Sequence, residues 1–307
     1  MKSIRKKVIL LVCSIAFSTS IFSQSELLFN DIHLYESLST VKEKLSDKVL
    51  SHSLIAIEEP IFPLSSDREE HLLCTNLKTI NGLLANVVFT FADDQLHYVQ
   101  VQGNATNTLV SKRKDTAITY LDFDVYRKDN LFSNPKNDLV RYITKEAAHT
   151  NLFAWQNPYV DGDGSISAIY KTTIEIPNFL KMGADLEQLR PLIEANSTII
   201  KEEKLDGSDP NAQLQLNCFG VEYAGFPRKI EARFGDGKLN TVWILTGKGE
   251  EDRLRKKLTA HYGDPIFVTD EWEIFENWTI GLRKDKPEIL LLTQELGQHY
   301  KKEYFKQ

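Results

Sequence analysis

The chain contains one β-hairpin pattern twice, and this duplication constrains the fold more than any other feature of the sequence. The first copy covers residues 85–102 and the second covers residues 228–245. A shift of 143 positions aligns the apolar residues of the two copies, Phe91 with Phe234, Leu96 with Leu239 and Val99 with Val242. Alternation of apolar and polar residues on both arms is typical of antiparallel strands that bury one face. The sequence therefore predicts two units built on the same plan.

Amphipathic helices are expected before and after each hairpin. In residues 37–45 a capping serine precedes apolar residues that share one face, and residues 185–193 repeat this pattern 148 positions later with an aspartate as the cap. Residues 249–263 have the strongest helix pattern, with acidic residues first, basic residues later and a glycine at the end. A matching helix is expected after Pro135, with an inner face formed by Leu139, Tyr142, Ile143 and Ala147.

These segments predict an α+β fold for each unit. A unit is expected to contain a short helix, an antiparallel sheet, a second helix and a closing hairpin. The first unit is expected to span residues 24–176 and the second residues 177–307. Residues 104–135 have no counterpart in the second half and are interpreted as an insertion.

The N-terminus has the pattern of a bacterial secretory signal peptide. A basic start is followed by an apolar run at residues 8–17 and by small and polar residues up to Gln24. Cleavage is expected near Ser23/Gln24, so residues 1–23, including Cys13, are assigned to the signal peptide. No apolar run approaches the roughly 20 residues that a membrane span requires. The chain is therefore predicted to be exported, to the periplasm or beyond, without a transmembrane span.

The charge of the chain argues against nucleic acid as a partner. The whole chain has a formal net charge of −6, and loss of the four basic residues in the signal segment makes the net charge −10. Nucleic acids and anionic membrane surfaces attract proteins through clustered positive charge. No nucleic-acid partner is predicted.

The two cysteines outside the signal segment, Cys74 and Cys218, lie a little upstream of the hairpin in each copy. A disulfide has to be considered in an exported protein. Equivalent positions in two separate cores would also suit two buried thiols. Both interpretations remain open from the sequence.

The sequence contains no catalytic, cofactor or metal motif that we accept. Seven histidines are scattered without the spacing of a metal site. Residues 161–165 resemble the start of a calcium loop, but Ile166 stands where that loop needs glycine, so a hairpin turn is predicted there. Residues 246–252 resemble a dinucleotide-binding loop, but three consecutive acidic residues would repel the phosphates. No catalytic residue, cofactor or metal is assigned.

The four tryptophans, Trp155, Trp243, Trp272 and Trp278, are the candidate binding residues. Aromatic side chains on one concave sheet face could bind a partner. They could instead fill the two cores, since aromatic residues bury large apolar areas.

Short motifs of the second unit resemble a family of envelope proteins. Met182-Gly183-Ala184-Asp185 precedes the first helix, Tyr262-Gly263-Asp264-Pro265 ends the second, and Trp272 begins a strand. This arrangement is similar to the SmpA/BamE and beta-lactamase-inhibitor-protein-like modules. The first unit has Tyr35-Glu36-Ser37 in place of the glycine motif and has no Tyr-Gly-Asp-Pro. The resemblance implies an exported protein that binds other proteins or scaffolds outer-membrane assemblies.

Three functions are considered from the sequence. The first is an exported, non-catalytic binding or scaffold protein of the bacterial cell envelope, which engages another envelope protein through its sheets or the cleft between the units. The second is a carrier of a small molecule or lipid, with a pocket between helix and sheet. The third is an enzyme with an unrecognised site. The oligomeric state is not predicted.

Overall fold

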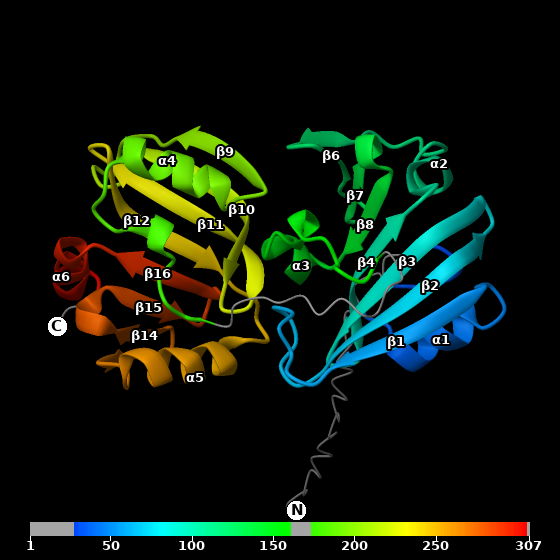
Figure 1. Cartoon of the computed structure of the whole chain (residues 1–307), viewed down its shortest axis with the longest axis horizontal. Helices are drawn as coiled ribbons and strands as arrows, with labels where there is room; N and C mark the ends of the chain where they lie inside the picture. The colour runs from blue at the N-terminus through cyan, green and yellow to red at the C-terminus, as the bar shows by residue number, and fades with distance from the viewer. Residues whose placement is uncertain (1–27, 161–172, 306–307) are drawn as a thin grey trace, which may run out of the picture.

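The computed structural model describes residues 28–160 and 173–305, which form two antiparallel sheets of eight strands each (Figure 1). The order in the first sheet is β1-β2-β3-β4-β8-β7-β6-β5, and in the second sheet it is β9-β10-β11-β12-β16-β15-β14-β13. The two orders are the same when strands are counted within each unit. The predicted boundary at residues 176/177 lies in a segment without helix or strand between the two sheets.

The first sheet consists of β1 (Ser51–Ile57), β2 (Glu69–Thr79), β3 (Gly82–Ala92), β4 (Gln95–Gln102), β5 (Ile118–Tyr120), β6 (Phe123–Tyr126), β7 (Leu131–Asn134) and β8 (Leu139–Ile143). The second consists of β9 (Ile199–Lys204), β10 (Leu214–Tyr223), β11 (Phe226–Gly235), β12 (Lys238–Leu245), β13 (Phe267–Val268), β14 (Trp272–Phe275), β15 (Ile280–Arg283) and β16 (Glu288–Leu292). The α-helices of the described residues are α1 (Leu38–Leu45), α2 (Ala105–Leu109), α3 (Lys145–His149), α4 (Leu186–Ala195), α5 (Glu251–Tyr262) and α6 (Gln294–Glu303).

The predicted α+β class is wrong, because the structure is an all-β fold of two sheets with short peripheral helices. The clearest error is the helix predicted after Pro135. Residues Leu139–Ile143 form the central strand β8, paired with β4 and β7, and only the five-residue α3 follows. All five residues of β8 are buried, because both faces of this strand are covered. A short run that is buried on both faces has no alternation and cannot be distinguished from a helix by its pattern.

The duplicated hairpin is confirmed, including its irregularities. The ladder between β3 and β4 shifts register between Thr90 and Phe91, and the ladder between β11 and β12 shifts between Arg233 and Phe234. These positions are 143 residues apart, as the alignment of the hairpins requires. Residues 104–135, which we interpreted as an insertion, contain α2, β5, β6 and β7, and their three strands take the places of β13, β14 and β15 in the sheet order.

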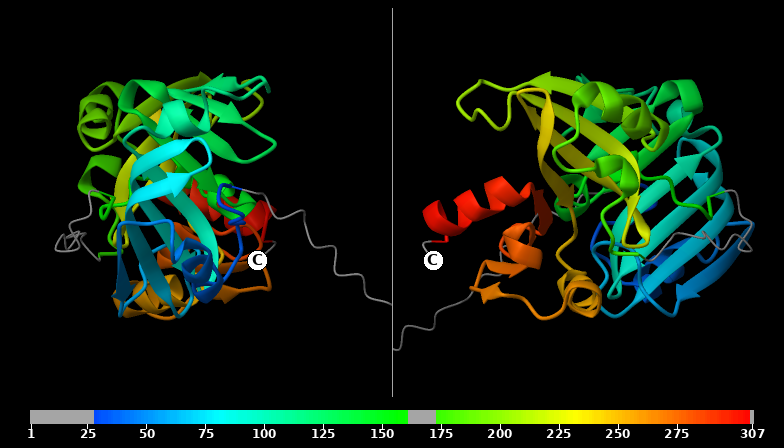
Figure 2. Two further views of the ribbon diagram at one scale, coloured as in Figure 1. Left: turned by 90° about the vertical axis from the view of Figure 1, so that its right-hand side faces the viewer. Right: turned by 60° about the vertical axis from the view of Figure 1, so that its left-hand side comes forward.

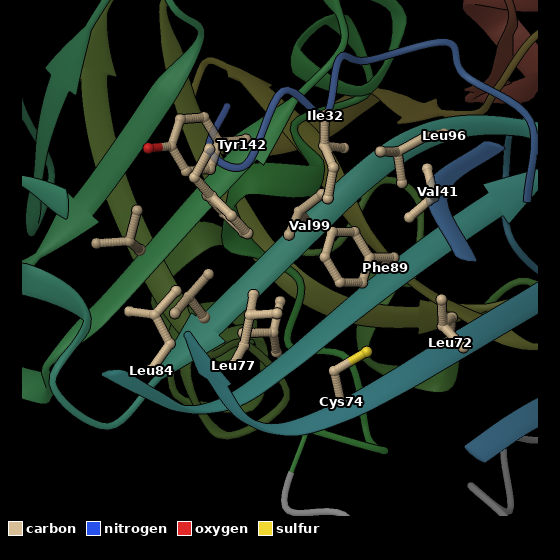
Figure 3. Packing of buried hydrophobic residues seen from close by; sticks show 14 of the residues in the cluster. Ile32, Val41, Leu72, Cys74, Leu77, Leu84, Phe89, Leu96, Val99 and Tyr142 are labelled. Carbon is tan, nitrogen blue, oxygen red and sulfur yellow. The ribbon is translucent and has the colours of Figure 1, made fainter. Parts of the chain in front are cut away.

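Each sheet has an inner face that is buried under helices. Leu38, Val41 and Leu45 of α1 enter the first core, as the sequence predicted, and Ser37 accepts the capping hydrogen bond from the Thr40 amide. Figure 3 shows this core, in which Phe89 and Val99 of the central strands point toward Ile32 and Val41. The second core is closed by buried residues of two helices, Leu189 and Ile193 of α4 and Leu254 and Leu258 of α5.

The two units pack against each other through aromatic residues and one arginine. Phe62 of the first unit lies 6.1 Å from Phe226 of the second, measured between ring centroids. Arg253 of α5 donates a hydrogen bond to the Phe62 carbonyl oxygen at 2.8 Å. A Cβ atom on Gly247 would lie 1.9 Å from the Pro63 carbonyl oxygen, so only glycine fits there. The glycine-rich loop that resembles a nucleotide-binding motif is therefore explained by the close approach of two backbones.

Candidate functional site

The candidate site lies on the outer face of the second sheet, which is the face opposite α4 and α5. Side chains alternate between the two faces along each strand. On β16, Ile289 and Leu291 therefore enter the inner core, while Leu290 and Leu292 point outward and pack against Leu296 of α6. Figure 2 shows α6 on the side of this sheet opposite α4.

An aromatic pocket of about 660 Å³ lies on this outer face beside α6. We call it the aromatic pocket. Its lining residues come from five strands, one loop and the C-terminal helix and tail: Trp243, Phe267, Thr269, Asp270, Glu271, Trp272, Arg283, Leu290, Tyr300, Tyr304 and Phe305. The volume is within the range of about 300–1,000 Å³ that is usual for ligand pockets.

Phe305 is the residue around which the aromatic side chains gather. Its ring centroid lies 5.3 Å from that of Phe267, 5.8 Å from Trp272 and 5.7 Å from Trp278. Trp272 in turn lies 6.3 Å from Trp243, with the ring planes inclined by 56°. Tilted and edge-on contacts at these distances are the favoured arrangements of aromatic pairs. These ring contacts connect Trp243, Trp272 and Trp278 with the C-terminal tail.

The local sequence makes room for Trp272. Ile274 of β14 pairs with Gly281 of β15, and a Cβ atom on Gly281 would lie 3.0 Å from the Trp272 ring. A glycine at this position therefore leaves room for the indole to pack close against β15. A larger residue at this point of the sheet would push the ring away from the pocket.

Charged groups flank the aromatic rings. The Arg283 guanidinium carbon lies 5.4 Å from the Trp272 ring centroid, within the range of a cation–π interaction. Arg283 also donates two hydrogen bonds to Asp285, at 2.7 and 2.9 Å, and these raise the pKa of the guanidinium. Asp270 and Glu271 are exposed at the mouth of the pocket. The pocket therefore combines apolar walls, the positively charged guanidinium of Arg283 and an acidic rim.

The structure brings together three of the four predicted tryptophans. Trp243 and Trp272 line the pocket, and Trp278 contacts Phe305 beside it. Trp155 lies elsewhere, buried between the units at 4.9 Å from Tyr98 and 5.2 Å from Phe226. The structure thus separates one tryptophan that joins the units from three that gather on one sheet face.

Sequence reasoning did not select the aromatic residues of the C-terminal tail. Tyr300, Tyr304 and Phe305 all line the pocket. The four-residue spacing of the two tyrosines was the available signal, because residues four apart on a helix lie on the same face. Phe267 and Arg283 were also missed, and no local pattern distinguishes them from other strand residues.

Cys74 and Cys218 are free thiols in separate cores, one in each unit. They occupy equivalent places, since Cys74 pairs with Val87 and Cys218 with Ile230 across the same strands of the two sheets. Burial raises the pKa of both thiols to about 12.

The outer face of the first sheet contains a buried chain of polar residues that the sequence did not reveal. His71 Nε2 lies 2.9 Å from Glu69 Oε1, and His71 Nδ1 lies 3.1 Å from Thr90 Oγ1. Asn157 donates to the same Thr90 oxygen at 2.9 Å. The order carboxylate, imidazole, hydroxyl resembles a nucleophilic triad. These four residues are at most 2% exposed, so the arrangement is closed to a substrate and serves to satisfy buried polar groups.

Residues 152–160 close this outer face of the first sheet. The Tyr98 hydroxyl donates a hydrogen bond to the Trp155 carbonyl oxygen at 2.7 Å, and the backbone amide of Asn157 donates to the side-chain oxygen of Gln100 at 3.1 Å. Tyr159 and Val160 then pack on β2 and β3. The equivalent faces of the two sheets therefore differ. In the first unit residues 152–160 cover the outer face, whereas in the second unit an aromatic pocket lies there.

Within residues 28–160 and 173–305, no group of three or more histidine, cysteine, aspartate or glutamate side chains could hold a metal ion. The calcium-loop resemblance at residues 161–165 and the signal segment lie outside the described residues. Among the described helices, none is long and apolar enough to cross a membrane. No family model, no curated protein and no solved structure shows a significant match to the chain.

Proposed function

We propose that the protein is an exported, non-catalytic binding or scaffold protein of the bacterial cell envelope, which holds another envelope protein at the aromatic pocket. The observation that carries this proposal is the gathering of Trp243, Trp272 and Trp278 on one sheet face, beside a pocket of about 660 Å³. The signal-peptide pattern and the resemblance to SmpA/BamE and beta-lactamase-inhibitor-protein-like modules support the same function and remain predictions.

The chemistry of the pocket suits a protein partner. Tryptophan, tyrosine and arginine are the residues that contribute most to protein–protein binding, because they bury large areas and still offer polar groups. Trp272 is only partly buried, so its ring retains surface for a partner. The exposed Asp270 and Glu271 would favour a partner segment in which an apolar side chain is followed by a basic one.

The proposal is tested by cross-linking in intact cells. A photoreactive amino acid is placed at Thr269, on the rim of the pocket, and at Lys128, an exposed turn residue of the first unit, as the matched control. We expect one reproducible protein adduct from position 269 that is lost on Trp272→Ala and is absent from position 128. Equal or random adducts from both positions would contradict a specific site.

A second candidate function is the binding of a small apolar molecule, and the size of the pocket favours it. Native mass spectrometry of the protein purified from cells distinguishes the two. A co-purifying molecule of fixed mass that is lost on Trp272→Ala would support a carrier, whereas a protein adduct without such a molecule would support the binding protein.

A further inference from the structure

The edge strands β1 and β9 occupy equivalent positions in the two sheets but have very different surfaces. Residue 52 pairs with Cys74 and residue 200 pairs with Cys218, so a shift of 148 positions aligns the two strands. β9 ends in the exposed charged run Lys201-Glu202-Glu203-Lys204. β1 has the sequence Ser-His-Ser-Leu-Ile-Ala-Ile, contains no lysine, arginine or acid, and is mostly exposed.

This difference matters because an edge strand presents unpaired backbone groups that can pair with a strand from another chain. Proteins prevent such pairing by placing charged side chains on the edge. β9 is protected in this way and β1 is not. Leu54 of β1 is 40% exposed, and the residue at the equivalent position of β9 is Glu202. Within the described residues, β1 has no strand beyond it.

We propose that β1 is a dimerisation edge, at which two copies of this chain pair their β1 strands antiparallel about a two-fold axis. The dimer would join two eight-stranded sheets into one continuous sheet. Two-fold symmetry is the usual arrangement of homodimers, and it makes one surface complementary to itself. This inference does not depend on the aromatic pocket.

The charges at the two ends of β1 favour a second copy in the antiparallel direction. Lys48 precedes the strand and Glu58 follows it. The Lys48 carbonyl oxygen accepts a hydrogen bond from the Lys78 amide at 2.7 Å, so the chain already follows β2 at this point. With Ser53 on the two-fold axis, Lys48 of each copy lies opposite Glu58 of the other. Opposite charges that face each other across strands are favourable, whereas a parallel pairing would place like charges together.

The two charged residues are available for this contact. Glu58 is exposed and Lys48 is partly exposed. Neither forms a salt bridge in the part of the chain that the structure describes. The contact is narrow, because it runs along one strand edge, so we expect a weak dimer with a dissociation constant on the order of 10 μM.

Sedimentation velocity of the full chain over a range of concentrations tests the proposal. Leu54→Glu gives β1 the residue that β9 has, and we expect the dissociation constant to rise by at least about ten-fold because the edge becomes charged. Glu202→Gln on β9 is the matched control and should leave the dimer unchanged. Circular dichroism confirms that each variant is folded.

A charge exchange tests both the partner and the direction of pairing, independently of Leu54. Lys48→Glu and Glu58→Lys should each weaken the dimer several-fold, since each places like charges opposite one another. The double variant with both substitutions should restore the dimer. A wild-type protein that stays monomeric at every concentration overturns the proposal. The same conclusion follows if Leu54→Glu dimerises as tightly as the wild type, or if the double variant is no stronger than the single ones.

Discussion

Tyr35 and Gly183 occupy the same position in the two units and share a left-handed backbone, with φ angles of 67° and 78°. The Tyr35 amide donates to the Leu96 carbonyl oxygen at 2.8 Å, and the Gly183 amide donates to that of Leu239 at 2.7 Å. Glycine adopts this conformation freely, whereas a residue with a Cβ atom does so at a cost of about 1 kcal/mol or more. In the first unit the tyrosine side chain offsets part of this cost, because its hydroxyl donates to Glu146 at 2.7 Å.

Gly183→Ala should lower the free energy of unfolding by about 1 kcal/mol, since alanine resists the left-handed region. A Cβ atom at this position meets no other atom within 4 Å, so the loss of stability would come from the backbone conformation alone. Urea denaturation measures the change. Lys181→Ala, where φ is −63°, is the control and should change the free energy by less than about 0.5 kcal/mol. Equal effects of the two substitutions would show that the left-handed geometry is not needed.

Glu250→Gln should destabilise the protein by about 3 kcal/mol, because it leaves a buried arginine without its counter-charge. Arg228 donates two hydrogen bonds to Glu250, at 2.6 and 2.9 Å, and both side chains are at most 1% exposed. Chemical denaturation measures the loss. The apolar double variant Arg228→Met with Glu250→Leu should lose less stability than the sum of its single variants, which a double-mutant cycle detects.

The control for the buried pair is Arg190→Ala, which removes an ion pair with Glu202 at the surface. The two side chains are 33% and 44% exposed, so we expect a loss of less than about 1 kcal/mol. A loss as large as that of Glu250→Gln would indicate that burial does not set the strength of these pairs.

Trp155→Ala should affect mainly stability, whereas Trp272→Ala should affect mainly binding. Trp155 is 6% exposed between the units, so its truncation should cost about 3–5 kcal/mol of stability. Trp272 lies on the pocket wall and is only partly buried, so its truncation should cost less and should abolish the adduct from position 269. Thermal denaturation and the cross-linking yield are measured for both variants. A Trp272→Ala protein that unfolds as readily as Trp155→Ala would indicate a core role instead.

The protein should lose stability in alkali, between about pH 9 and about pH 12. The ordinary pKa of a thiol is 9.0, and burial raises the pKa of Cys74 and Cys218 to about 12 in the folded state. Burial raises the pKa of Tyr98 to about 12 as well, from 10.0. Between these values the unfolded chain releases protons that the folded chain keeps. The contribution of these three groups to the free energy of unfolding is therefore fully present below pH 9 and is lost as the pH rises toward 12. Urea midpoints measured at successive pH values test this.

The same burial predicts the reactivity of the thiols. A thiol reagent at neutral pH should react slowly with the native protein, because thiolate is the reactive form and a raised pKa suppresses it. In denaturant, Cys74 and Cys218 should both react, and Cys13 adds a third thiol only where the signal segment is retained. Reaction of neither cysteine without prior reduction would indicate a disulfide.

The local elements followed from the sequence where apolar and polar side chains alternate with the period of a strand or a helix. The hairpins at residues 85–102 and 228–245, the serine cap at Ser37 and the helix α5 all match their patterns. The first hairpin keeps this pattern although most positions of β3 and β4 are buried, because polar side chains lie on its covered outer face. β8 has no exposed position, and its apolar residues were misread as the face of a helix.

The aromatic pocket was predictable only in part. The tryptophans were recognised as candidates, but their grouping depends on contacts between residues far apart in the chain. Trp243 and Phe305 line one pocket, although 62 positions separate them. Trp155 was indistinguishable from the other three by its neighbours in sequence, since distant residues of both units, Tyr98 and Phe226 among them, bury it.

By itself the sequence determined that this protein is built twice, because matched apolar residues and turns 143 positions apart impose the same strand pairing on each copy. The tertiary structure decided which segments cover the outer face of each sheet. In the first unit residues 152–160 cover that face and form hydrogen bonds with Tyr98 and Thr90, while in the second unit α6 leaves the aromatic pocket beside it. The physical reason is that a periodic pattern specifies which side of a strand is apolar, but not which distant segment covers it.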